Sequence, residues 1–225
     1  MSAYDPTAMN GDVSNVDGVS RHGLHESKVL GVVIGIVTDN VDPRSLGRVR
    51  LRLPRLSGDI ETGWARVASF MAGQDRGAVF LPEVDDEVLV AFEHGDVNVP
   101  YVIGSLYNGK DTPPYANEDS NNNKRLIQSR SGHVVRLDDT PGQEKIEIED
   151  KSGENKIVID STENKITIEA KTKLELKVGD EGSFVLKGKE IIFEASDTIS
   201  MTSTGTVDLA SSSKVNVLAP EINLN

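Results

Sequence analysis

Residues 188–219 read GKEIIFEA, SDTISMTS, TGTVDLAS and SSKVNVLA, which are four successive copies of one eight-residue unit. The fourth and sixth positions of each unit are apolar, and polar residues stand between and around them. Apolar residues two apart are typical of a β-strand with one buried face. These inward positions are Ile191, Phe193, Ile199, Met201, Val207, Leu209, Val215 and Val217. We therefore predict one short strand per unit, separated by corners rich in Gly, Ser, Asp and Asn.

Earlier copies of the unit, ENKIVIDS (154–161), ENKITIEA (163–170) and KTKLELKV (171–178), extend the repeat toward the N-terminus. A strand with two inward side chains cannot exclude water, and an eight-residue coil is too short to enclose a core within one chain. Three strands make the smallest closed prism. We expect residues 144–225 to form a needle, an intertwined trimeric triple-stranded β-helix. The alternative is a flat antiparallel meander, which would expose two edges and one apolar face.

Composition agrees with a fibrous tail joined to a small globular head. Only 4% of the residues are aromatic, and the chain has no Cys, so neither disulfides nor cysteine metal sites are available. The net charge of −12 disfavours a nucleic-acid partner, which needs Lys and Arg to replace counterions. The sequence has no apolar run long enough to span a bilayer and no secretory signal pattern. We expect a protein made and assembled in the cytoplasm.

The N-terminal half divides into an arm and a small β domain. Residues 1–28 lack periodicity and are expected to form a flexible arm. Residues 29–108 contain five short apolar runs separated by turn residues, which favours an OB-fold barrel. The expected strands are 31–39, 48–53, 64–68, 87–92 and 101–104.

Arg48, Arg50 and Arg52 alternate with apolar residues in the second of these strands. OB barrels often bind nucleic acid through a basic face with aromatic side chains. Because few aromatic residues stand nearby, we favour contact with a protein partner through these arginines. The inward face of the strand would then carry Val49 and Leu51.

The sequence offers no constellation of residues suited to catalysis, cofactor binding or metal binding. Residues 109–130 are an expected linker, and its carboxylates Glu118 and Asp119 have no pocket that would raise a pKa. His22 and His25 are expected to be solvated in the arm. The remaining histidines, His94 and His133, are expected to be structural or solvated.

The β domain resembles a known family in its motifs. DP (42–43), LGRVRLRLP (46–54), GWARVA (63–68), GAVFLPEVDDEVLVAFEHGD (77–96) and PYVIGSLYN (100–108) closely resemble the phage baseplate assembly protein V family. The same stretches are similar to the OB domain of VgrG spikes in type VI secretion. Residues 131–143 resemble the junction that those proteins place before their β-helix.

The resemblance implies a homotrimeric, non-enzymatic central spike of a contractile injection machine, in a particle that can be released from the cell. It also implies a separate hub protein and a contact with the target membrane only on firing. A PAAR-like tip protein would cap the needle through Pro220, Ile222, Leu224 and Asn225. The alternatives are a trimeric tail fibre or adhesin, and an OB-fold nucleic-acid-binding protein with an oligomerising tail.

Overall fold

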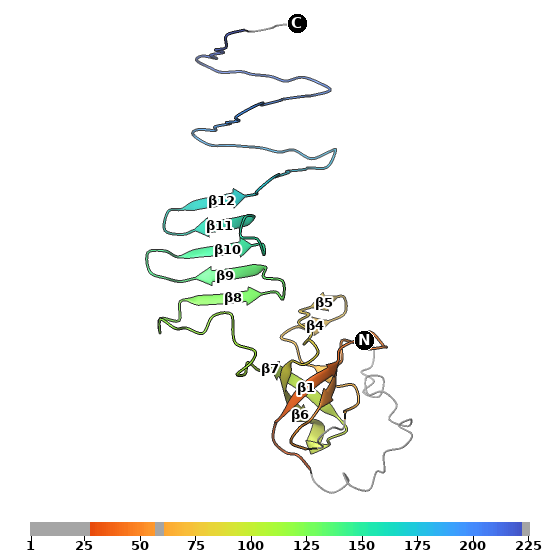
Figure 1. Ribbon diagram of the computed structural model, residues 1–225. Helices are drawn as coiled ribbons and strands as arrows, with labels where there is room; N and C mark the ends of the chain where they lie inside the picture. The colour runs from red at the N-terminus through yellow and green to blue at the C-terminus, as the bar shows by residue number, and fades with distance from the viewer. Residues whose placement is uncertain (1–27, 57–60, 222–225) are drawn as a thin grey trace. The chain divides into compact units, whose positions relative to one another are not determined.

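The computed structural model describes residues 28–56 and 61–221 (Figure 1). The predicted all-β class is confirmed, because the described residues form strands and the only helical segment among them is the 3-10 turn η2 (Glu93–Gly95). The chain divides into two compact units between Ile168 and Glu169. The first unit holds a β-barrel domain and a five-stranded meander, and the second holds the later eight-residue repeats.

Five strands form the sheet of the barrel domain in the order β2-β1-β6-β7-β3. They are β1 (Val33–Asp39), β2 (Arg50–Arg52), β3 (Arg66–Val67), β6 (Glu87–Phe92) and β7 (Pro100–Ser105). β3 and β7 run parallel, and the other neighbours are antiparallel. A bridge between Val49 and Ala65 links the β2 and β3 ends of the sheet, so the order closes as in a small OB-type barrel.

The barrel core is built from the alternating apolar residues of these strands. Its fully buried members include Val37, Leu51, Val88, Val90 and Val102. β1 passes close to β6 at Gly35, where an added Cβ would lie 2.8 Å from a methyl of Val90. A glycine is therefore required at this point for the two strands to approach. Between β3 and β6, a small exposed hairpin is formed by β4 (Ala72–Gly73) and β5 (Arg76–Gly77).

The second sheet is a meander in the order β12-β11-β10-β9-β8, visible as a stack of neighbouring strands in Figure 1. Its strands are β8 (Lys124–Gln128), β9 (Val134–Asp138), β10 (Lys145–Glu149), β11 (Lys156–Asp160) and β12 (Lys165–Glu169). The structure therefore differs from the expected division of the chain. β8 lies within the expected linker, β9 lies within the expected junction, and the repeat units at 154–170 pair within one chain.

Beyond β12 the chain changes character. Residues 170–221 run back and forth without forming strands (Figure 1). Backbone torsions explain the change, because each hairpin connection of the meander contains one residue with positive φ: Gly132, Gly142, Gly153 or Asn164. Such residues permit a tight reversal of the chain. Residues 165–221 show no positive φ, so their corners lack the tight reversal found at each hairpin of the meander.

Candidate assembly interface

One face of the meander is aliphatic and uncovered. The register places Ile146 opposite both Leu137 and Ile159, and Ile148 opposite both Val135 and Ile157. All of these side chains are exposed, although in an ordinary sheet they would form the buried face. Ile127 of β8 joins the same face opposite Val135. The meander therefore presents a continuous aliphatic surface, although soluble proteins rarely leave such a surface uncovered.

The opposite face of the meander carries charges that pair with one another. Arg136 Nη1 lies 2.8 Å from Glu147 Oε2, and Lys145 Nζ lies 3.1 Å from Glu147 Oε1. Burial acts to raise the pKa of Glu147, but the hydrogen bonds that Lys145 and Arg136 donate, together with their positive charges, leave this pKa lowered. Charged side chains on this face thus compensate one another within the chain, whereas the aliphatic side chains of the other face are exposed.

The eight predicted inward residues of the later repeats are all exposed in the single chain. Their exposed fractions run from 48% for Ile191 to 72% for Leu209. Leu174 and Leu176 continue the same pattern in the unit at 171–178, and both are also exposed. We call this row of alternate apolar residues, from Val135 to Val217, the aliphatic stripe. Its role in a trimer core stays a prediction, since the structure holds a single chain.

The aliphatic face of the meander begins before residue 144, where the sequence predicts the needle to start. Val135 and Leu137 lie in the expected junction and Ile127 lies in the expected linker, yet all three share the face of Ile146 and Ile148. The spacing of Val135 and Leu137 in VVRLD (134–138) was the available signal, whereas KRLIQ (124–128) shows no apolar alternation.

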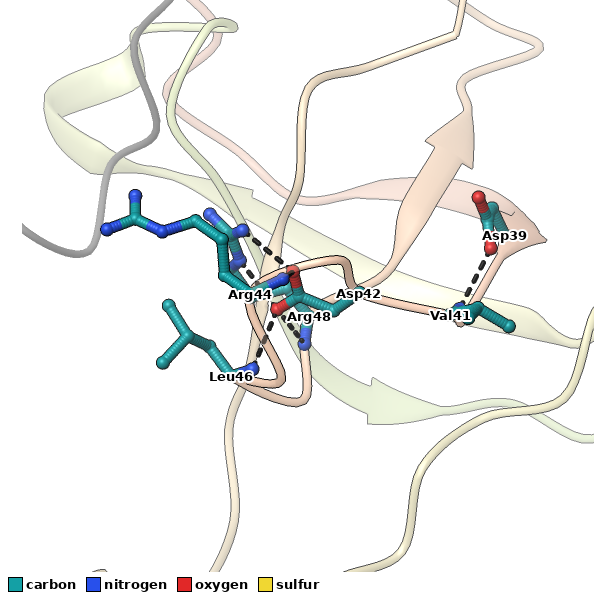
Figure 2. Close-up of polar contacts among 6 residues, drawn as sticks. All are labelled: Asp39, Val41, Asp42, Arg44, Leu46 and Arg48. Carbon is teal, nitrogen blue, oxygen red and sulfur yellow. Dashed lines mark hydrogen bonds and ion pairs between the residues drawn. The ribbon is translucent and has the colours of Figure 1, made fainter.

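Arg48 does not share a surface with Arg50 and Arg52. This corrects the expectation that all three arginines contact a protein partner. The Arg48 side chain is only 2% exposed and forms a two-point ion pair with Asp42 (Figure 2). Nε lies 2.9 Å from Asp42 Oδ2, and Nη2 lies 2.8 Å from Oδ1. The same carboxylate accepts hydrogen bonds from the backbone N–H groups of Arg44 and Leu46. Arg48 thus holds the β1–β2 turn together and is not available to a partner.

The electrostatics of this pair follow from its geometry. Hydrogen bonds from the Arg48 guanidinium and from three backbone N–H groups keep the pKa of Asp42 well below its usual range, against the opposing effect of burial. The Arg48 pKa is raised by the same contact. Both groups remain charged at neutral pH, and each satisfies the other in the interior.

Arg50 and Arg52 remain predicted partner contacts. Arg50 Nη1 lies 2.7 Å from Glu61 Oε2, and its guanidinium stands 5.1 Å from the ring centre of Trp64. Glu61 also accepts a hydrogen bond from Thr38. Because Glu61 offsets the charge of Arg50, this face is not the bare basic surface that a nucleic-acid phosphate backbone favours.

The candidate catalytic residues are not brought together into a site. Asp119 accepts hydrogen bonds from the backbone and side chain of Asn121 and from Tyr115, and these contacts lower its pKa. His133 accepts a hydrogen bond through Nδ1 from the Lys151 backbone. His94 lies in η2 with a φ of 51°.

Other predictions concern metals, membranes and the two ends of the sequence. No cluster of three or more His, Asp or Glu able to hold a metal ion occurs in the described ranges. Within the same ranges there is no helix long and apolar enough to cross a membrane. His22 and His25 lie outside the described residues, as do Ile222, Leu224 and Asn225 of the predicted tip contact. Pro220 is described and exposed, in a segment without strands.

Comparison with known proteins places the barrel domain in a known family of domains. Residues 33–107 match the type VI secretion system/phage-baseplate injector OB domain, which confirms the predicted OB fold. The type VI secretion system spike protein VgrG5 of Pseudomonas aeruginosa is 32% identical over 143 residues, covering 59% of this chain and 17% of that protein.

Two proteins of Vibrio cholerae show a similar match. The type VI secretion system spike protein VgrG3 is 29% identical over 140 residues, covering 60% of this chain and 13% of that protein. The actin cross-linking toxin VgrG1 is 26% identical over 140 residues, covering 60% of this chain and 12% of that protein. The chain thus matches less than a fifth of the length of each of these relatives.

Proposed function

We propose that this VgrG-like chain, whose residues 33–107 are an injector OB domain, is the central spike of a contractile injection machine. The aliphatic stripe is the observation that carries this proposal. It extends over more than 80 residues of the sequence, from Val135 to Val217, and its side chains are exposed among the residues that the structure describes. Three copies with their stripes facing a common axis would bury it and leave the ion-paired face of the meander in water.

The energetics of such an assembly favour a closed trimer. Covering an aliphatic side chain contributes about 1.5–3 kcal/mol relative to leaving it in water. Each of the three chains contributes the eight predicted core residues. The free energy gained by burying them is therefore large even after the cost of association. A rod whose chains cover one another keeps its shape under axial load, which suits a part that is pushed through an envelope.

The partners follow from this role. A hub would bind the OB domain through Arg50 and Arg52, and a PAAR-like tip protein would contact Pro220, Ile222, Leu224 and Asn225. We propose that the chain acts mechanically and not as an enzyme, and that it touches the target membrane only on firing. We also propose that the chain is assembled into its particle in the bacterial cytoplasm and that the particle can later be released from the cell.

Two measurements test the proposal. Light scattering on the purified full chain is expected to give three times the chain mass of 24.3 kDa. Deletion of the coding sequence in the producing cell is expected to abolish contractile particles or their delivery, and the full chain should restore them. A monomeric protein, or normal delivery without it, would contradict the proposed function.

A further inference from the structure

One charged residue interrupts the aliphatic face of the meander. The register of β8–β11 places eight side chains on this face, and seven of them are aliphatic. The eighth is Arg125 of β8, which lies directly opposite Leu137 of β9. The other charged residues of these four strands lie on the opposite face. Arg125 therefore occupies a position at which the period of two calls for an aliphatic residue.

Arg125 belongs to a strand at the edge of the sheet. In the order β12-β11-β10-β9-β8, only β9 pairs with β8 among the residues that the structure describes. The backbone N–H and C=O groups of an edge strand are a template on which a strand of another molecule can add. The exposed aliphatic face increases this hazard, because an added strand could continue that face. Natural sheets guard such edges with charged side chains on the inward face.

The contacts of Arg125 keep its charge at this edge and in water. Its Nη1 lies 3.1 Å from Asp139 Oδ2 and donates a hydrogen bond of 2.8 Å to the backbone carbonyl of Asn122. The Arg125 side chain is 53% exposed and that of Asp139 is 66% exposed. An ion pair this exposed contributes little to the stability of a fold. The stability of the single chain is therefore a weak reason for an arginine at this position.

The same charge opposes the pairing of two β8 strands. In an antiparallel pair centred on Leu126, Arg125 of each copy would stand opposite Ile127 of the other copy. The guanidinium would then lose water without gaining a polar partner. In a pair centred on Arg125, the two guanidinium groups would face each other, and like charges directly opposite destabilise a sheet. Both registers keep the aliphatic faces on one side, and both carry a penalty that an aliphatic residue would not.

We propose that Arg125 keeps the edge of β8 from pairing with the β8 edge of a second copy of this chain. The inference goes beyond the proposed function and does not depend on it. Covering the face of a sheet leaves its edge open, so the need for this charge is the same in a single chain and in an assembly of chains. Arg125 thereby limits how far the meander can extend by adding strands at this end.

The test is Arg125→Val in the full-length protein, which makes the face of β8 aliphatic throughout. Light scattering over a dilution series measures the concentration at which assemblies larger than the native one appear. We expect this concentration to fall at least about tenfold, because the burial of an unpaired charge no longer opposes the pairing. The loss of one positive charge takes the net charge from −12 to −13. Stronger repulsion between chains would by itself reduce association, so a general charge effect predicts the opposite direction.

Three control variants are expected to associate as the native protein does. Arg130→Val removes the same charge from the β8–β9 connection, where the side chain is 83% exposed and pairs with Glu83. Asp139→Asn removes the ion pair but leaves the charge of Arg125 in place. Arg125→Lys keeps a positive charge on the aliphatic face. Circular dichroism checks that each variant retains its strands.

Each outcome decides for or against the inference. An Arg125→Val protein that associates no more than the native protein would overturn it. Equal association of Arg130→Val would assign the effect to net charge, and equal association of Asp139→Asn would assign it to the lost ion pair; either result would also overturn the inference. If Arg125→Val does not fold, Arg125→Met retains the long aliphatic stem and carries the same expectation. A native protein that is monomeric would contradict the proposed function but not this inference, since every comparison is made with the native assembly.

Discussion

Ile199→Asp tests the direction in which the repeats face. Ile199 occupies the fourth position of SDTISMTS and is expected to point to the trimer axis. Its replacement brings three carboxylates together around that axis. The neighbouring substitution Ser200→Asp adds the same charge on the opposite face of the same strand, because successive side chains alternate.

The magnitude follows from the exposure of the side chain. Ile199 is 54% exposed in the single chain, so about half of its burial remains to be gained in the trimer. That half is worth about 1 kcal/mol per chain. The larger effect is the desolvation of three carboxylates, which costs several kcal/mol per ion when no partner is present. The sum is on the order of 10 kcal/mol per trimer, enough to weaken association well beyond a thousandfold.

Light scattering over a dilution series, together with thermal unfolding, measures the effect. The expected result is a dissociated or aggregated Ile199→Asp protein and an intact Ser200→Asp trimer. If both variants remained trimeric with the same stability, or if Ser200→Asp were as damaging as Ile199→Asp, the inward assignment would be wrong.

Four further predictions concern the first unit. Arg48→Met leaves the Asp42 carboxylate buried without its partner and is expected to destabilise the OB domain by about 3–5 kcal/mol in urea unfolding. The pKa of Asp42 is lowered in the folded state. Its carboxylate therefore contributes to the free energy of unfolding above the unfolded pKa of about 4, and this contribution is lost as pH falls through the folded pKa. The free energy of unfolding of Asp42→Asn should accordingly depend less on pH in this acid range. Gly35→Ala forces a Cβ against Val90 and should cost about 1–3 kcal/mol, measured by the loss in melting temperature. Gly153→Ala, at a φ of 74°, should cost about 1 kcal/mol or more by loosening the β10–β11 hairpin, whereas Gly179→Ala is the matched change at a site without positive φ and is expected to be nearly neutral.

The all-β class and the OB domain could be predicted from local patterns. Alternation in residues 48–53 predicts a strand with Val49 and Leu51 inward, and both are buried in the structure. The strand expected at residues 87–92 is β6, whose alternate residues Val88 and Val90 are buried. The fate of Arg48 could not be predicted in the same way. Alternation places it on the polar side of its strand, but a contact with Asp42 across the turn draws it into the interior.

The sequence by itself determined which residues of the repeats at 154–219 form alternating apolar pairs, because a period of two assigns each side chain to one face of an extended strand. Only the tertiary structure decided which strands pair within the chain. Hairpins form where Gly or Asn adopts positive φ at the connection, as at Gly142, Gly153 and Asn164. Composition alone does not mark these positions, since Gly179 and Gly205 also stand between apolar pairs but do not adopt positive φ. Pairing depends on the conformation that a connection takes, and that conformation is set by the strands on both sides.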